Sequence, residues 1–238
     1  MSFHPSQLEA IRWGTGPALI LAGPGSGKTT VITHRVRALI TERRVDPSRI
    51  LVITFTKAAA DEMKERFLRL MGEERTPVSF GTFHAVFFKI LKIAYHYNGS
   101  HILRPEKRME LIRQVFDQVR PQVEDEAEFL SEILNEISRV KGDRVDLAHY
   151  YSNHCPEEVF HALYRGYEEK LREAGLIDFD DMLRLCDELL QARPDILAAW
   201  QKKYQYILID EFQDINRIQY EVIRMLAAPE NNLFIVGD

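Results

Sequence analysis

The sequence has 238 residues, of which 45% are hydrophobic and 28% are charged. These fractions are ordinary for a globular protein, and they exclude collagen-like, low-complexity and disordered chains. The two cysteines, Cys155 and Cys186, are too few and too far apart for a disulfide framework or a zinc site. The N-terminus lacks the pattern of a signal peptide, and no apolar run reaches the roughly 20 residues of a membrane helix. We therefore expect a cytoplasmic protein without a membrane partner.

The net charge of −5 is unevenly distributed along the chain. Residues 94–190 contain 12 Lys and Arg against 21 Asp and Glu, whereas residues 1–93 contain 14 against 8. We expect the acidic middle to be mainly a solvated face, with docking of a partner protein as the alternative. The basic flank permits nucleic-acid binding without requiring it.

Apolar patterning predicts an α/β fold with a parallel sheet. Short apolar runs predict strands over residues 19–22, 50–54, 78–82, 206–209 and 233–236. Helical patterns cover 58–71 and 83–93, and from about residue 95 to 190 only helical spacing is found. We therefore expect an α/β domain made of residues 1–93 and 191–238. Residues 94–190 would form an all-helical insertion within it.

The segment Ala22–Thr29 (Ala-Gly-Pro-Gly-Ser-Gly-Lys-Thr) follows the first predicted strand and precedes a helix. It fits the phosphate-binding loop of P-loop NTPases except that Ala22 replaces the first glycine. Gly25 and Gly27 let backbone amides turn inward toward phosphate, and the N-terminus of the following helix favours an anion. Lys28 would reach the β- and γ-phosphates of ATP, and the Thr29 hydroxyl would bind Mg²⁺. The alternative is a glycine-rich turn without a ligand.

A second motif, Tyr206–Glu211, is an apolar strand that ends in two carboxylates. Ligand sites of open α/β sheets lie at the carboxyl ends of the strands. Asp210 would therefore hold Mg²⁺ as a Walker B aspartate, and Glu211 would polarise the attacking water as general base. Such a strand end alone is a weak signal, and it gains weight from the P-loop in the same chain.

Several single residues are weaker signals. Gln7 lies ahead of the first strand and could bond an adenine edge, although a surface glutamine is the simpler interpretation. Phe55 lies at a strand end and could stack on a base or belong to the core. His84 follows the next strand and could be structural. The aromatic residues of the insertion have helical spacing and are most simply core: Phe160, Tyr164 and Tyr167.

Taken together, these segments resemble the UvrD/Rep/PcrA family of superfamily 1 DNA helicases along almost the whole chain. Residues 3–11 are similar to the family's Gln motif, 22–29 to its P-loop, 53–63 to motif Ia and 81–84 to motif Ib. Residues 175–182 resemble the segment that closes the family's helical insertion. Residues 209–214 resemble motif II, and Gly237-Asp238 resembles the start of motif III.

The resemblance implies a RecA-like domain of the 1A type, an insertion of the 1B type, and ATP-driven 3′-to-5′ movement on single-stranded DNA. Partners would be single-stranded or 3′-tailed duplex DNA and accessory proteins of DNA repair or replication. Catalytic residues would be Lys28, Asp210, Glu211 and Gln213, the last coupling nucleotide state to movement. Residues that bind ATP would be Gln7, Ala22, Gly23, Pro24, Gly25, Ser26, Gly27, Lys28, Thr29 and Thr30, with Thr29 and Asp210 holding Mg²⁺. Residues along the DNA would be Phe55, Thr56, Lys57, Thr82 and His84.

The sequence departs from the family pattern in three places. Thr30 stands where many members have an arginine near the nucleotide, and Lys57-Ala58 stands where they have Asn-Lys. The chain also ends at Asp238, directly after a predicted strand, so we expect a piece of a longer protein. The second RecA-like domain and its arginine fingers would then lie outside it. This portion alone would be inactive in unwinding and would hydrolyse ATP poorly.

Three alternatives remain open from the sequence. The chain could come from the motor subunit of a helicase–nuclease of the AddA or RecB type, with the nuclease domain further along the gene. It could be a P-loop kinase for a small metabolite, although Asp-Glu-Phe-Gln-Asp has no role there. It could also be a non-catalytic nucleotide-binding module, against which Lys28, Asp210 and Glu211 argue.

Overall fold

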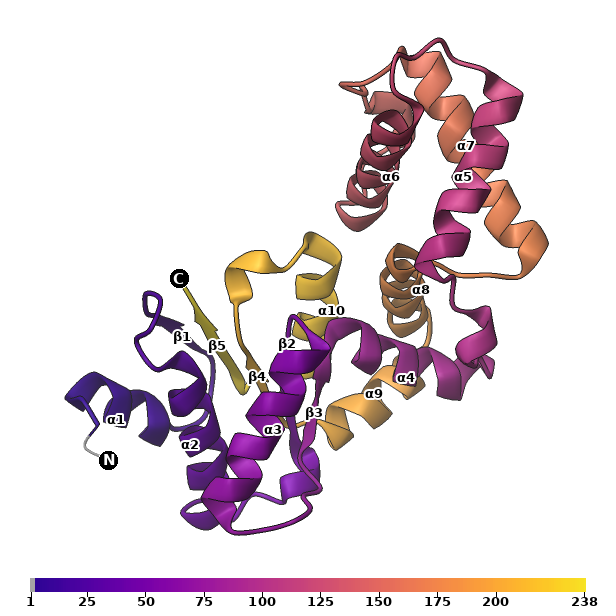
Figure 1. Cartoon of the computed structure of the whole chain (residues 1–238). Helices are drawn as coiled ribbons and strands as arrows, with labels where there is room; N and C mark the ends of the chain where they lie inside the picture. Colours follow the sequence, from indigo (N-terminus) through magenta and orange to yellow (C-terminus); the bar gives the residue numbers. More distant parts are fainter. Residues whose placement is uncertain (1–2) are drawn as a thin grey trace. The chain divides into compact units, whose positions relative to one another are not determined.

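A five-stranded parallel sheet, with strands from both ends of the chain, forms the centre of one part of this computed structural model, which describes residues 3–238 (Figure 1). The strand order is β1-β5-β4-β2-β3. The predicted strands are confirmed to within one residue at each end, and so is the α/β class with a parallel sheet. Their bounds are β1 Ala18–Leu21, β2 Ile50–Thr54, β3 Ser79–Thr82, β4 Tyr206–Ile209 and β5 Leu233–Gly237.

Helices cover both faces of the sheet. The chain moves in one direction across the sheet from β1 to β2 to β3 and in the other from β3 to β4 to β5. Because parallel crossovers are right-handed, the helices of the first two connections lie on one face and those of the last two on the other. The helices of the sheet unit are α1 Pro5–Arg12, α2 Lys28–Thr41, α3 Lys57–Met71, α9 Pro194–Lys203 and α10 Arg217–Ala227.

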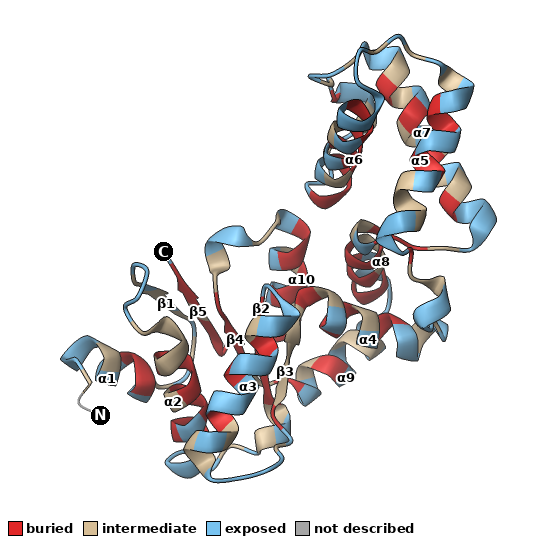
Figure 2. Ribbon diagram, viewed as in Figure 1, coloured by how far each residue is buried: buried red, intermediate tan, exposed pale blue. Residues whose placement is uncertain are grey.

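Strand β2 illustrates the burial that this covering produces (Figure 2). Its alternate residues Ile50 and Val52 pack in one core cluster with Ile32 of α2 and Phe67 of α3. Residues 51 and 53, which point to the opposite face, are also fully buried. A parallel strand covered on both sides is apolar throughout, which is why this segment was recognisable without alternation.

Residues 94–190 are helical, as predicted, apart from an isolated bridge between Ile102 and Ile177. Val115, Ile133 and Phe160 lie in the core of these helices. The helices are α4 Phe83–Tyr95, α5 Pro105–Val119, α6 Glu126–Gly142, α7 Glu157–Ala174 and α8 Phe179–Ala192.

The chain divides into two compact units, whose boundaries differ from the predicted ones. The first unit is Met1–Val86, Leu189–Ile215 and Gln219–Asp238, and the second is Phe87–Glu188 with Asn216–Ile218. The main changes of unit fall inside α4 and α8, each of which continues without a break, and the first two residues of α10 also belong to the second unit. A continuous helix gives no compositional signal of a boundary, so the sequence placed the changes at residues 94 and 190 instead. No helix among residues 3–238 is long and apolar enough to cross a bilayer.

Candidate nucleotide site and strand-tip surface

The glycine-rich loop joins β1 to α2 at the carboxyl edge of the sheet. Gly25 and Gly27 have φ of 74° and 86°, in the left-handed region that side chains other than glycine rarely adopt. Gly27 is the N-cap of α2, whose first residue is Lys28. The Ala22 amide donates to the Gly237 carbonyl at 3.0 Å, so the ladder to β5 continues to the start of the loop. The open amides at the start of α2 suit an anion.

Lys28 lies between two carboxylates at this edge. Its Nζ lies 3.4 Å from Glu211 Oε2 and also contacts Asp238 Oδ1. The hydrogen bond to Asp238 raises the pKa of the ammonium, as do both carboxylate charges, against the opposing effect of burial. The ammonium is therefore firmly charged where the loop would receive phosphate.

Gln213 connects the two motifs that end β4 and β5. Its Nε2 donates to Glu211 Oε2 at 2.7 Å, and its Oε1 accepts from the Asp238 amide at 3.2 Å. A Cβ added at Gly237 would lie 2.7 Å from Gln213 Oε1, so a side chain there would displace the Gln213 amide from its present position. Glu211 itself has φ of 54°. This strained residue is thus held in place through its side chain.

Asp210 and Thr29 offer free oxygen ligands at the same place. Asp210 is buried at the tip of β4, and burial, followed by the charge of Glu211, raises the pKa of its carboxyl group. Its Oδ1 accepts from the Glu211 amide at 3.1 Å. Among residues 3–238, Asp210 Oδ2 and the Thr29 hydroxyl take part in no hydrogen bond. An unbonded carboxylate oxygen and an unbonded hydroxyl oxygen are ligands that suit a hard divalent cation.

Gln7 lies against the loop rather than on an unrelated surface. Its Nε2 donates to the Ser26 carbonyl at 2.9 Å, and its Oε1 accepts from the His4 amide at 3.0 Å. An amide group has two N–H donors and two acceptor lone pairs, so one of each remains. That pair matches the N7 acceptor and N6 amino donor of adenine. A cavity of about 660 Å³, within the size range of small-molecule sites, is lined by Gln7, Trp13, Leu19, Ser26 and Lys28.

Arg35 has a role that the sequence did not reveal. It is 3% exposed, and its guanidinium donates to the Trp13 carbonyl at 2.8 Å and to the Gly14 carbonyl at 3.3 Å. Two longer bonds of 3.5 Å reach the carbonyls of Ala10 and Ile11. It therefore binds the carbonyl end of α1, the helix that carries Gln7. Burial lowers its pKa to about 10. The spacing to its partners, 21 to 25 residues, leaves no local pattern to find.

The five residues that the resemblance assigned to DNA lie at the tips of β2 and β3. These neighbouring strands pair in register, with Thr54 opposite Thr82, so both tips share one edge. Phe55 is 50% exposed, which contradicts the core alternative. The Thr56 hydroxyl caps α3 by accepting from Ala59 N at 3.1 Å, and Lys57, the first residue of α3, is exposed. Burial lowers the pKa of His84.

The strand order divides the edge into two parts. The tips of β1, β5 and β4 carry Lys28, Asp238 and Asp210, and the tips of β2 and β3 carry Phe55 and Thr82. Strands β4 and β2 are neighbours, and the Asp210 amide donates to the Ile53 carbonyl at 3.0 Å. The predicted nucleotide and DNA residues thus form two adjacent groups on one sheet.

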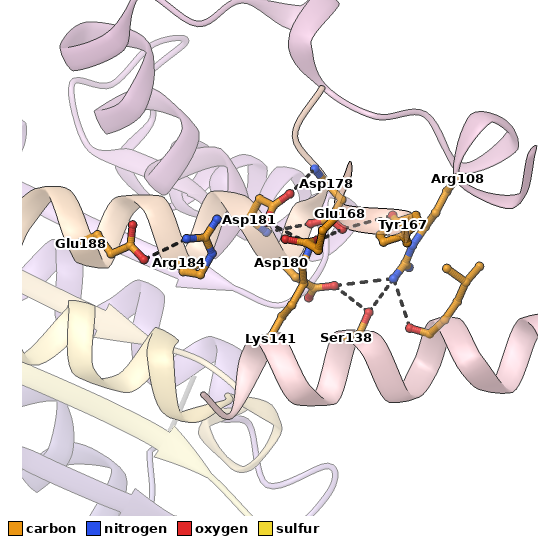
Figure 3. A network of polar contacts seen from close by, with 11 residues as sticks. Arg108, Ser138, Lys141, Tyr167, Glu168, Asp178, Asp180, Asp181, Arg184 and Glu188 are labelled. Carbon is orange, nitrogen blue, oxygen red and sulfur yellow. Dashed lines mark hydrogen bonds and ion pairs between the residues drawn. The ribbon is translucent and has the colours of Figure 1, made fainter. Parts of the chain in front are cut away.

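A buried acidic cluster in the second unit has a cation of its own (Figure 3). Glu168, Asp178 and Asp181 have oxygens within 4.8 Å of one another, which is the spacing of a metal site. The Lys141 ammonium lies 2.5, 2.8 and 3.0 Å from them, respectively. Because the ammonium fills the position of an ion, the cluster is a structural network. Tyr167 completes it by donating to Asp178 Oδ2 at 3.2 Å.

The expectation of a solvated acidic face is wrong for four residues of the insertion, which are buried: Glu136, Asp178, Asp181 and Asp187. Each has a partner that sequence separation conceals. Glu136 accepts from the Ser152 hydroxyl and the Asn153 amide, and Asp187 pairs with Arg144.

Comparison with known proteins identifies relatives over the whole length of the chain. Residues 3–238 match the family described as the UvrD/REP helicase N-terminal domain. YjcD of Bacillus subtilis is 38% identical over 252 residues, which cover all of this chain and 32% of YjcD. The ATP-dependent DNA helicase PcrA of Staphylococcus aureus is 34% identical over 245 residues, or 99% of this chain and 33% of PcrA. PcrA of Staphylococcus epidermidis is 35% identical over 247 residues. The chain spans about a third of the length of these relatives.

Proposed function

The chain belongs to the UvrD/REP helicase N-terminal domain family, and on this basis we propose that it is the ATP-binding part of a DNA helicase that couples ATP hydrolysis to 3′-to-5′ movement on single-stranded DNA. The observation that carries the proposal is the meeting of Lys28, Asp210, Glu211 and Gln213 at the sheet edge that also carries the tips of β2 and β3. The substrates are single-stranded and 3′-tailed duplex DNA, and proteins of repair or replication are the accessory partners.

ATP binds with its adenine against Gln7 and its phosphates in the loop from Ala22 to Thr30. The free N–H and lone pair of Gln7 support adenine recognition, since the N–H can donate to N7 and the lone pair can accept from the N6 amino group, whereas guanine presents its O6 acceptor to that lone pair. Lys28 exchanges its contacts with Glu211 and Asp238 for the β- and γ-phosphates. The negative charge of the phosphates then balances the ammonium in place of the two carboxylates.

Asp210 and the Thr29 hydroxyl hold Mg²⁺, for which their unbonded oxygens are suited. The ion would neutralise charge that develops on the phosphoryl oxygens. Release of Glu211 from Lys28 leaves its carboxylate held by Gln213 alone, and it then orients the attacking water and accepts its proton. Gln213 also accepts a hydrogen bond from the Asp238 amide, so a displacement of Glu211 would be transmitted to the residue that follows β5.

DNA lies along the tips of β2 and β3. The exposed ring of Phe55 stacks on a base, and Lys57 pairs with a phosphate. Thr56 and Thr82 accept backbone amides through their hydroxyl oxygens and keep the hydroxyl protons for phosphate. His84 is half-buried, and its lowered pKa keeps the ring neutral at pH 7. It therefore acts as a hydrogen-bonding group and not as a cation.

The proposal is tested by ATP hydrolysis of the full-length gene product with and without single-stranded DNA. We expect strong stimulation by DNA, abolished in Lys28→Ala and retained in the matched control Lys202→Ala, which removes an exposed lysine of α9. Hydrolysis that is indifferent to DNA would refute the helicase function. A 3′-tailed duplex that is unwound faster than a 5′-tailed one establishes the direction.

A further inference from the structure

The second unit has an exposed basic surface that the proposed function does not use. Residues 75–105 contain no Asp or Glu, in a chain that has 36 of them. The second half of α4 and the residues after it lie within this stretch. We name their surface part the α4 ridge, and it consists of the exposed residues Lys89, Lys92, Tyr95 and His96 and the half-buried Tyr97.

Helical spacing brings the cations of the ridge onto one face. Lys89 and Lys92 are three residues apart on α4, and both side chains are exposed. The exposed His96 follows the end of the helix, with φ of 58°. The opposite face of α4 is buried through Ile90 and Leu91, which fixes the orientation of the helix. Neither Lys89 nor Lys92 forms an ion pair with any of residues 3–238. Both charges therefore face solvent without an internal partner.

Aromatic rings continue the surface beyond the lysines. The centroids of Tyr95 and Tyr97 lie 5.8 Å apart, and those of Tyr97 and His101 lie 5.4 Å apart, both pairs at 60°. Tyr95 is 47% exposed, and its neighbour Ile93 is 63% exposed. In this row of rings Tyr95 is exposed and Tyr97 and His101 are half-buried, and an exposed apolar patch of this kind is typical of a surface that a ligand covers.

Lysines that have no carboxylate partner and that lie beside an exposed aromatic ring suit one kind of polymer, a single-stranded nucleic acid. Unpaired cations attract phosphates, and aromatic faces stack on bases of any sequence. An acidic peptide would use the lysines and leave the rings bare. We propose that the α4 ridge binds a segment of single-stranded DNA, as a second contact surface apart from the tips of β2 and β3. The choice of DNA over RNA rests on the proposed function.

The test is the binding of fluorescein-labelled dT20 to the chain by fluorescence anisotropy. We expect the double variant Lys89→Ala/Lys92→Ala to weaken binding at least 5-fold at low salt. Its plot of log Kd against log salt should lose a slope of about 1.4, since each phosphate contact on a single strand contributes about 0.7. Tyr95→Ala should weaken binding about 5-fold or more and Tyr95→Phe should restore it, because stacking needs the ring and not the hydroxyl.

The matched control is Lys64→Ala/Lys202→Ala, which removes the same charge from exposed positions of α3 and α9. An equal loss in this control, or no loss in the ridge variants, would overturn the proposal. Competition by a 20-residue polyglutamate as strong as by unlabelled dT20 would assign the ridge to an acidic protein instead. If Phe55→Ala abolished binding and the ridge variants did not weaken it, the ridge proposal would be overturned and the proposed function would stand. Failure of the proposed function itself is read separately, from DNA-stimulated ATP hydrolysis.

Discussion

At the scale of single residues, Arg35 is the buried group on which the position of α1 depends. We expect Arg35→Ala to lower the free energy of unfolding by about 3 kcal/mol, because the carbonyls of Trp13 and Gly14 lose buried donors. It should also weaken ATP binding, since α1 carries Gln7. Urea unfolding followed by tryptophan fluorescence measures the first effect, because Trp13 and Trp200 both lie in the first unit. Binding of a fluorescent ATP analogue measures the second.

Arg37→Ala is the control for this prediction, since Arg37 is an exposed arginine on the same helix. Arg35→Lys should recover only part of the loss, because an ammonium cannot donate to carbonyls in the fork geometry of a guanidinium. If Arg35→Ala were as stable as Arg37→Ala, the anchoring role of Arg35 would be wrong.

How far a residue could be predicted depended on the distance to its partners in sequence. The position of Lys28, Asp210 and Glu211 at one edge of the sheet was predictable because each lies in a short motif beside a strand. Arg35 and Lys141 were missed because they act on residues far along the chain, Lys141 on Asp178 at a separation of 37. A buried cation with distant partners leaves no periodicity or spacing to recognise.

At the scale of elements, helices α5 and α7 approach each other closely at Gly166. A Cβ added there would lie 2.5 Å from Val115 Cγ1, and the β-branched valine has little freedom to move within a helix. We expect Gly166→Ala to destabilise the chain by about 1–2 kcal/mol, the overpacking strain exceeding the gain in helix propensity. Thermal or urea unfolding followed by far-UV circular dichroism measures it.

Gly99→Ala is the matched control, because nothing lies within 4 Å of the Cβ that it adds. The double variant Gly166→Ala/Val115→Ala should regain part of the loss, since it removes the atom that obstructs the new methyl group. A Gly166→Ala protein that is more stable than the parent would show that α5 and α7 can separate at no cost.

The polar network between α6, α7 and α8 makes stability depend on pH. Burial and the charge of Asp178 raise the pKa of Asp181 from 3.8 to about 6. Its neutral form is therefore favoured in the folded state, and the stability it contributes is present below pH 4 and lost as the pH rises through 6. Relative to the parent, Asp181→Asn should gain about 2–3 kcal/mol of unfolding free energy between pH 4 and pH 7. Urea unfolding at several pH values measures the difference.

Asp117→Asn is the control for the pH dependence, because Asp117 is an exposed acid of α5. Lys141 lowers the pKa of Asp178 against the effect of burial, so that residue has the opposite dependence. A difference between Asp181→Asn and the parent that shrank toward pH 7 would contradict the assignment to Asp181.

The elements themselves were largely predictable, and their grouping was not. Strands covered on both faces are apolar throughout and end at polar motifs, so their bounds were predicted to one residue. The unit boundaries inside α4 and α8 were missed because a helix that runs from one unit into another keeps its apolar spacing. The acidic composition of the insertion likewise concealed which carboxylates are paired and buried.

At the scale of the whole molecule, the chain spans about a third of the length of its relatives, and the contacts of Lys28, Asp210 and Glu211 among residues 3–238 include no arginine. An arginine provided from outside an ATP site typically contributes about 10³–10⁵ to the rate of phosphoryl transfer. The 238-residue chain should therefore hydrolyse ATP at least about 10³-fold more slowly than the full-length gene product with DNA. Side-by-side assays of both, with Lys28→Ala as background, measure the ratio. Comparable rates would mean that residues 1–238 contain the complete site.

The hydrogen bond from the Asp210 amide to the Ile53 carbonyl joins the two groups of strand tips within a rigid sheet. If ATP and DNA bind these two groups as proposed, any coupling between them is reciprocal: the factor by which ATP alters the affinity for DNA equals the factor by which DNA alters the affinity for ATP. A motor that advances along a DNA strand has to bind and release that strand in alternation. For the proposed function, such alternation requires that ATP and its hydrolysis products have unequal coupling factors, and the two groups of strand tips meet at β4 and β2, which are neighbouring strands about 4.8 Å apart.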